Sequence, residues 1–171
     1  MRLNSVVLMA AIAATSSAAA QATRAVTTLS PTVGNTASGR ATVVISPAGA
    51  SITVEIRGLS SGSHGLHIHE FGDCSAPDAS SAGAHFNPTN QPHAGPKDER
   101  RHVGDFGNIV ADKDGNARLE ILDARLALDG PTSVLGRSMV VHANPDDLRT
   151  QPTGNTGARV ACGVIGVAKS E

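Results

Sequence analysis

The chain has 171 residues, a formal net charge of −1 at pH 7, and neither Trp nor Tyr. Its length suits one domain with its own core, and its near-zero charge gives no reason to expect nucleic acid or an anionic membrane surface as a partner. With three Phe in all, the core must be built from Val, Ile, Leu and Ala.

Residues 1–22 have the organisation of a secretory signal peptide. A positive charge at Arg2 precedes the apolar run 6–14, and small residues crowd a cleavage site near residues 20–22. A membrane anchor is the alternative, but it needs about 20 apolar residues, and polar residues interrupt this run directly after it. We therefore expect export, to the periplasm or the extracellular space, and one domain over residues 23–171 with no membrane partner after cleavage.

The periodicity of the remaining chain is that of β-strands. Residues 41–46 and 51–57 are β-branched runs on either side of residues 47–50, which predicts a hairpin with a four-residue connection. In the second run Ile52 and Val54 alternate with polar residues, so one face should be buried. Further strand-like segments are 64–69, 108–111, 117–121, 138–142 and 159–167.

Other segments have a weaker pattern or none. Residues 119–128 have helical propensity, but the turn signals that flank them favour two short strands. Residues 23–27 show no pattern, and we expect them to be disordered. Residues 71–104 and 143–158 are long, irregular and rich in Pro, Asn, Asp and Gly, and loops of this length are usually functional. The sequence thus predicts an antiparallel β-sandwich or barrel with a metal site on its loops.

The chain contains two cysteines, Cys74 and Cys162. In an exported chain an even count suggests one disulfide, and two buried free thiols are the alternative. Ligation of a metal by cysteine is disfavoured, because neither residue belongs to a close Cys pair.

All seven histidines lie between His64 and His142, which indicates metal chemistry. His67 and His69 are two residues apart in a strand, so both rings leave the same face and can bind one metal. His142, at the end of another apolar strand, is a candidate third ligand, and such a site suits copper or zinc. His64 falls on the opposite face, where we expect it to bond to backbone groups as a support for the strand end.

A second group of candidate ligands lies in and just after the first long loop. Its members are His85, His93, His102 and Asp105. Three imidazoles and a carboxylate match tetrahedral zinc, and metal binding would give an otherwise irregular loop a fixed shape.

Several motifs together resemble the copper/zinc superoxide dismutases over essentially the whole chain after the signal. They are HGLHIHEFGD at 64–73, GAHFNP at 83–88, GPKD at 95–98, HVGD at 102–105 and GNTGARVACGVIG at 154–166. The resemblance implies an all-β fold, an eight-stranded antiparallel Greek-key barrel with two long functional loops. It also implies an intrasubunit disulfide between Cys74 and Cys162.

The same resemblance implies a role for each candidate ligand. The copper ligands would be His67, His69, His85 and His142, and the zinc ligands would be His85, His93, His102 and Asp105. His85 would then bridge the two metals as an imidazolate. Asp146 matches a supporting carboxylate that holds His69 or its neighbour His67 and, on the zinc side, His93.

The implied activity is the disproportionation of superoxide, a small anion, into dioxygen and hydrogen peroxide through a Cu(II)/Cu(I) cycle. Arg159 matches the arginine that attracts the substrate, and His85 would release copper and carry a proton. The family default is a homodimer, and a copper chaperone is a candidate further partner. The rival hypothesis is an exported copper/zinc-binding module, a metal buffer or metallochaperone, without catalysis.

Overall fold

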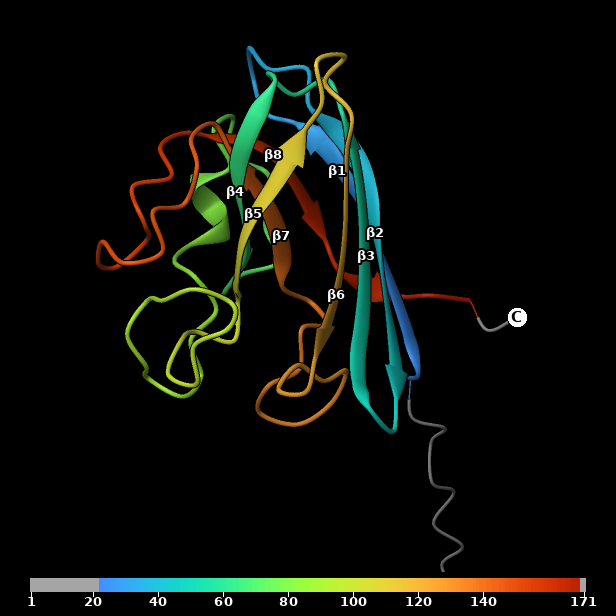
Figure 1. Cartoon of the computed structure of the whole chain (residues 1–171). Helices are drawn as coiled ribbons and strands as arrows, with labels where there is room; N and C mark the ends of the chain where they lie inside the picture. The colour runs from blue at the N-terminus through green and yellow to red at the C-terminus, as the bar shows by residue number, and fades with distance from the viewer. Residues whose placement is uncertain (1–21, 170–171) are drawn as a thin grey trace, which may run out of the picture.

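The computed structural model describes residues 22–169 and is shown in Figure 1. Most of the expected signal segment, residues 1–21, lies outside the described residues. Within them the structure is almost entirely β, with one 3-10 helix, η1 (Ser80–Ala82). The strands are β1 (Arg24–Pro31), β2 (Ser38–Ser46), β3 (Gly49–Arg57), β4 (Gly62–His69), β5 (Asp105–Ala111), β6 (Ala117–Asp123), β7 (Ser138–His142), β8 (Arg159–Val164) and β9 (Gly166–Val167).

The strands form one closed antiparallel barrel. Their order is β2-β3-β6-β5-β4-β7-β8-β1-β9, and the pairing of β1 with β2 closes the ring. Eight strands take part in this closure, and the two-residue β9 pairs only with β1 at its side. Since β6 lies beside β3 and β7 beside β4, the connections cross over as in a Greek key. The predicted fold class is confirmed.

The structure corrects the expectation of disorder at residues 23–27, because most of them belong to β1. Ala25, Thr27 and Leu29 face inward, while Val26 and Thr28 face outward. Because a polar Thr faces inward and an apolar Val faces outward, the alternation of buried and exposed residues does not appear as an alternation of apolar and polar residues in the sequence. β1 nevertheless pairs with β2 over six consecutive positions and with β8 at Ser30 and Pro31.

Two other expectations differ in detail from the structure. The hairpin between β2 and β3 has a two-residue connection, because Ser46 already pairs with Gly49. In the segment 119–128 the first expected strand is the end of β6, but the second is replaced by an isolated bridge at Ala127. β6 ends where the Asp123 side chain accepts a hydrogen bond from the backbone of Arg125, 2.8 Å away.

The barrel interior is aliphatic, as the composition predicts. Alternating residues of β3, Ile52, Val54 and Ile56, are buried in one hydrophobic cluster that also contains Leu66 of β4 and Ile109 of β5. Burying each such side chain stabilises the fold by roughly 1.5–3 kcal/mol.

In the described part of the chain, no helix is both long and apolar enough to cross a bilayer.

A disulfide joins Cys74, in the first long loop, to Cys162 of β8, with the two Cα atoms 5.8 Å apart. The alternative of two free thiols is therefore excluded. Because the bond spans 88 residues of sequence, it restricts the unfolded chain strongly, which stabilises the fold by about 4–5 kcal/mol in the chain-entropy model. It also anchors the first long loop to the barrel wall.

The closure of the barrel between β8 and β1 depends on a residue without a side chain. A Cβ atom at Gly163 would lie 2.3 Å from the carbonyl oxygen of Thr28 in β1, a backbone atom that cannot turn aside. We expect Gly163→Ala to lower the free energy of unfolding by about 1–3 kcal/mol, because it pushes two paired strands apart. Urea unfolding with the disulfide intact measures this change.

Gly166→Ala is the matched control, since no heavy atom lies within 4 Å of a Cβ built there. Its free energy of unfolding should stay within about 0.5 kcal/mol of the parent value. Equal stability of the two variants would contradict the role given to Gly163.

Candidate metal centre

Two groups of potential ligands lie buried side by side, next to the paired strands β4 and β7. The first consists of His67, His69, His85 and His142, and the second consists of His85, His93, His102 and Asp105. In each group the potential ligand atoms lie within 4.8 Å of one another. We call them the strand group and the loop group. His85 belongs to both.

Paired strands supply most of the strand group. His67 and His69 come from β4, which pairs with β7, and His142 is the last residue of β7. His85 comes from the first long loop but is held beside β4 by a β-bridge to His69. The backbone of Phe86 donates to the carbonyl of Ile68 at 2.8 Å, which fixes this part of the loop to the strand end.

In the strand group, hydrogen bonds to residues outside the group leave one ring nitrogen of each histidine directed into it, and the Nε2 atoms of His69 and His142 lie 3.3 Å apart. His67 Nε2 lies 2.8 Å from Asp146 Oδ2, and His69 Nδ1 donates to the carbonyl of Gly83 at 2.9 Å. The remaining nitrogens of these rings point into the group, and His67 Nδ1 and His85 Nε2 are buried without a protein partner. Such orphaned buried nitrogens indicate a site for a metal ion.

In the loop group, three imidazoles converge on one carboxylate. The Nδ1 atoms of His85, His93 and His102 lie 2.9, 3.1 and 3.2 Å from the oxygens of Asp105. The last two contacts lack hydrogen-bond geometry, so these two nitrogens are also unpaired. The donor set of three nitrogens and one oxygen fits tetrahedral zinc, whose ligands would sit about 2.0–2.2 Å from the ion.

Burial keeps the histidines of the strand group neutral. It lowers the pKa of His85 to about 4 and that of His142 to about 3, and it also lowers the pKa of His67 and His69. A neutral imidazole offers a lone pair to a metal at pH 7 without first losing a proton.

In the loop group, two carboxylates counteract the effect of burial on the pKa of a histidine. Burial opposes the charge on His93, but its short contacts with the carboxylates of Asp105 and Asp146 outweigh this effect and raise the pKa of His93 to about 9. Burial also works against the charge on Asp105 and Asp146, yet hydrogen bonds from the histidines keep the pKa of both carboxyls below the usual value. Both carboxylates are therefore ionised at neutral pH and add negative charge beside the potential ligands.

Asp146 connects the two groups. Its Oδ2 contacts His67, and its Oδ1 lies 2.9 Å from His93 Nε2. The sequence left open whether Asp146 contacts His67 or His69. In the structure it contacts His67, while His69 is held by the backbone carbonyl of Gly83. Asn108 of β5 holds the backbone of Asp146 at both polar groups, at 2.7 and 2.9 Å.

His64 belongs to neither group, although it lies in the same strand as His67. Its Nδ1 lies 2.8 Å from the carbonyl oxygen of His142, and its Nε2 lies 2.9 Å from that of Ser60. Both ring nitrogens face backbone atoms, so neither is free for a metal. The contact with His142 ties the end of β7 to β4.

An open pocket of about 500 Å³ reaches the strand group from the surface. Its lining residues are His69, His142, Asn144, Thr153, Asn155, Thr156, Gly157 and Arg159. Arg159 is therefore the one residue with a permanent charge in the pocket wall. Burial lowers the pKa of Arg159, but a guanidinium stays protonated in proteins.

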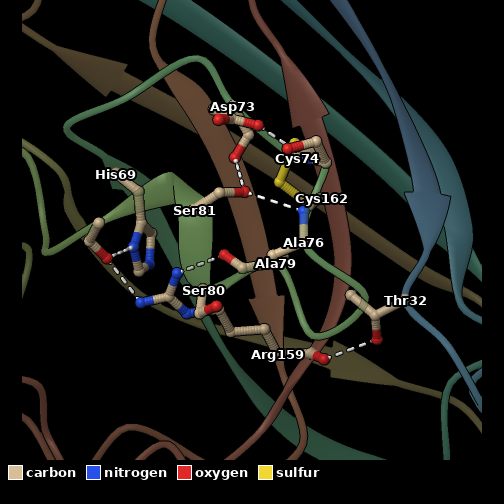
Figure 2. The surroundings of a disulfide bond; sticks show 12 residues. Thr32, His69, Asp73, Cys74, Ala76, Ala79, Ser80, Ser81, Arg159 and Cys162 are labelled. Carbon is tan, nitrogen blue, oxygen red and sulfur yellow. Dashed lines mark hydrogen bonds between the residues drawn. A yellow bond between two sulfur atoms is a disulfide. The ribbon is translucent and has the colours of Figure 1, made fainter.

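Figure 2 shows how the guanidinium of Arg159 is held. Its Nη1 and Nη2 donate to the carbonyls of Ala79 and Gly83, at 2.5 and 2.6 Å. The Gly83 carbonyl also accepts the bond from His69, so one oxygen orients both a potential ligand and the arginine. The carbonyls belong to the loop that follows Cys74, and the disulfide joins this loop to β8 three residues beyond Arg159.

Apart from Asp146 and His64, the sequence did not identify the residues that orient the ligands and Arg159. Ala79 and Gly83 act through backbone carbonyls, which no residue type reveals, and Ala79 has a left-handed φ of 58° that its sequence does not suggest. Asn108 is an amide in a strand without a recognisable motif. These roles become visible only in three dimensions.

A second surface depression, of about 760 Å³, is unrelated to the histidines. It lies across β2, β3 and β6 and is lined mainly by exposed polar and charged residues such as Arg40, Glu55 and Arg118.

Comparison with known proteins identifies the family. The family model for copper/zinc superoxide dismutase matches residues 37–165. Among curated proteins, an extracellular superoxide dismutase [Cu-Zn] of Brugia pahangi is 49% identical over 127 residues, which cover 69% of this chain and 63% of that protein. The chain thus matches a little under two thirds of the length of this relative.

Among solved structures, the crystal structure of the clock protein EA4 has a TM-score of 0.82 and 38% identity, and the match covers 90% of this chain and 99% of the other. The fold, the matched region and the two donor sets agree, and copper and zinc are the metals that fit them. The chain belongs to the copper/zinc superoxide dismutase family.

Proposed function

We propose that the protein disproportionates superoxide: two superoxide anions and two protons give dioxygen and hydrogen peroxide. The observation that carries this proposal is the imidazole of His85, shared by two buried ligand groups, one of which opens into a pocket with a fixed cation. A redox-active ion and a structural ion can be held side by side in this arrangement, within reach of a small anion.

In this proposal the strand group holds copper and the loop group holds zinc. The strand group is made of imidazoles alone, on or beside rigid strands, and borders the pocket, which suits a copper ion that must meet substrate. The loop group includes the carboxylate of Asp105 and offers four ligands, which suits a closed structural zinc site. Asp146 supports one ligand in each group and fixes its ring orientation.

When bound, copper supplies the one-electron Cu(II)/Cu(I) couple, whereas zinc supplies charge and no redox chemistry. The protein contributes the attraction of the substrate and the handling of protons. Arg159 presents a guanidinium whose position is fixed by two carbonyls, so it can draw an anion into the pocket without reorganising.

His85 is suited to moving a proton at Nε2. Its Nδ1 faces Asp105 in the loop group, and its Nε2 faces the strand group with no protein partner. This atom can therefore offer a lone pair or carry a proton while the ring stays in place. A proton held there can pass to the reduced oxygen species, and a second proton comes from solvent.

The second candidate function is a copper/zinc-binding module without catalysis, such as a metal buffer or metallochaperone. Both donor sets would serve it equally well. The guanidinium of Arg159 favours the enzyme, because it lies in the pocket wall beside His69 and His142 and faces neither group as a ligand.

The disulfide and the extracellular relative indicate export. We propose the periplasm or the extracellular space as the compartment, with residues 1–22 as the signal. A copper chaperone is a candidate partner for loading the strand group through the pocket.

The proposed activity and the role of Arg159 can be tested together. The purified chain, loaded with copper and zinc, should disproportionate superoxide with a rate that falls as salt is added. We expect Arg159→Ala to bind the metals normally but to lose about tenfold or more in rate, with a flatter salt dependence.

Arg57→Ala, which removes an equal charge from an exposed site on β3, is the matched control and should keep the parent rate. Bound copper and zinc without activity in the parent chain would favour the metal-binding module instead. A rate and a salt dependence in Arg159→Ala equal to those of Arg57→Ala would remove the role of Arg159 alone.

We also propose that the protein forms a homodimer through an apolar patch at β1, β8 and β9. The patch consists of Val26, Phe71, Val164 and Val167, which are 41, 53, 44 and 64% exposed. Val26 pairs with Gly166 next to Val167, and a Cβ on Gly72, next to Phe71, would lie 3.1 Å from Val164. Contiguous apolar side chains on an exposed sheet face are typical of a protein interface.

Sedimentation velocity tests this interface. The parent chain should sediment as a dimer at micromolar concentration, and Val164→Lys should be a monomer, because it places a charge inside the proposed interface. Val110→Lys on β5, where the parent Val is 63% exposed and outside the patch, should remain a dimer. A monomeric parent chain, or a dimeric Val164→Lys, would contradict the proposed face.

A further inference from the structure

The side-chain amide of Gln151 binds both polar backbone groups of His93. The N–H of His93 donates to Gln151 Oε1 at 2.8 Å, and Gln151 Nε2 donates to the His93 carbonyl at 2.7 Å. Nε2 also donates to the carbonyl of Arg149 at 3.1 Å. One amide thus reproduces the paired hydrogen bonds of neighbouring β-strands between two loops that are far apart in sequence.

Every other polar contact of His93 is set by a carboxylate. Its Nε2 lies 2.9 Å from Asp146 Oδ1, and its Nδ1 is buried 3.1 Å from Asp105 Oδ2. The second long loop therefore holds His93 at both ends, at the backbone through Gln151 and at the ring through Asp146. Nδ1 is left as the free nitrogen, pointing into the loop group.

The segment that carries Gln151 also forms the rim of the pocket. Thr153, Asn155 and Thr156 follow Gln151 closely in the chain and line the pocket beside Arg159. Gly154 of the same segment also packs directly against the loop group, since a Cβ atom built there would collide with Asp146 and His93. The position of His93 and the shape of the pocket rim are thus fixed by one short segment.

We propose that Gln151 is a positioning residue of the loop group, which couples metal binding at His93 to the order of residues 147–154 at the pocket rim. The inference rests on the proposed assignment of zinc to the loop group. Coupling of this kind is reciprocal. If the hydrogen bonds between Gln151 and His93 strengthen zinc binding, then zinc must equally stabilise the bonded conformation of residues 147–154.

The first test is the zinc affinity of the full chain, measured by competition with a chelator. We expect Gln151→Ala to bind zinc about tenfold more weakly than the parent chain, a loss typical of residues that orient a ligand. Gln91→Ala is the matched control: it removes the same amide from the first long loop, where the side chain bonds only to the carbonyl of Thr89, and its zinc affinity should not change.

The second test is hydrogen exchange of the amides of residues 147–154, with and without zinc. In the parent chain and in Gln91→Ala, zinc should slow exchange in this segment. In Gln151→Ala it should slow exchange much less, because the segment is no longer tied to His93. A purely structural role of Gln151 would change exchange equally in both states.

Gln151→Glu keeps the size of the side chain but faces the His93 carbonyl with an acceptor, and it should show the same two losses. It carries the comparison if Gln151→Ala does not fold. Zinc affinity and zinc-dependent exchange equal to those of Gln91→Ala would overturn the inference. A parent chain that binds no zinc through His93 would instead overturn the assignment on which it rests.

Discussion

The arrangement of the site depends on one constraint, the fixed orientation of the His85 ring between two ligand groups. The bridge from His85 to His69 and the flanking backbone bonds hold the residue beside β4. Nδ1 then faces Asp105, and Nε2 faces the strand group. If the ring turned over or moved away, the two groups would become separate sites. The remaining features of the fold can be understood as means of holding this ring and its neighbours still.

Rigid strands and anchored loops share this task. Three histidines of the strand group stand on the regular strands β4 and β7, whereas the loop group depends on segments with little regular structure. These segments are held by the disulfide at Cys74 and by two side-chain amides that hydrogen-bond to backbone groups. Asn108 binds the backbone of Asp146, and Gln151 binds the backbone of His93. Buried nitrogens without partners cost free energy in the metal-free protein, and metal binding offsets that cost, so binding and folding are coupled.

Features that depend on the spacing of residues along the chain could be predicted from the sequence. Contacts between residues that are far apart in the chain could not. Alternation predicted β3, and histidine spacing predicted two clusters of ligands, but the place of His85 in the strand group followed only from the family resemblance. β1 was missed because Thr27 faces inward and Val26 outward. Strand periodicity places His67 and His69 on one face, so it could not decide which of them contacts Asp146. The carbonyls that hold Arg159 and the amide of Gln151 act across long sequence separations, and only the folded chain brings them to their partners.

Electron paramagnetic resonance of protein loaded with Cu(II) in both groups can show whether one imidazole is shared by two metals. An imidazolate between two Cu(II) ions couples their unpaired electrons. If His85 is the shared ring, the ordinary Cu(II) signal should be largely lost when the second group fills, although elemental analysis finds the copper still bound. A signal that grows in proportion to the bound copper, as for two independent ions, would contradict the shared role of His85.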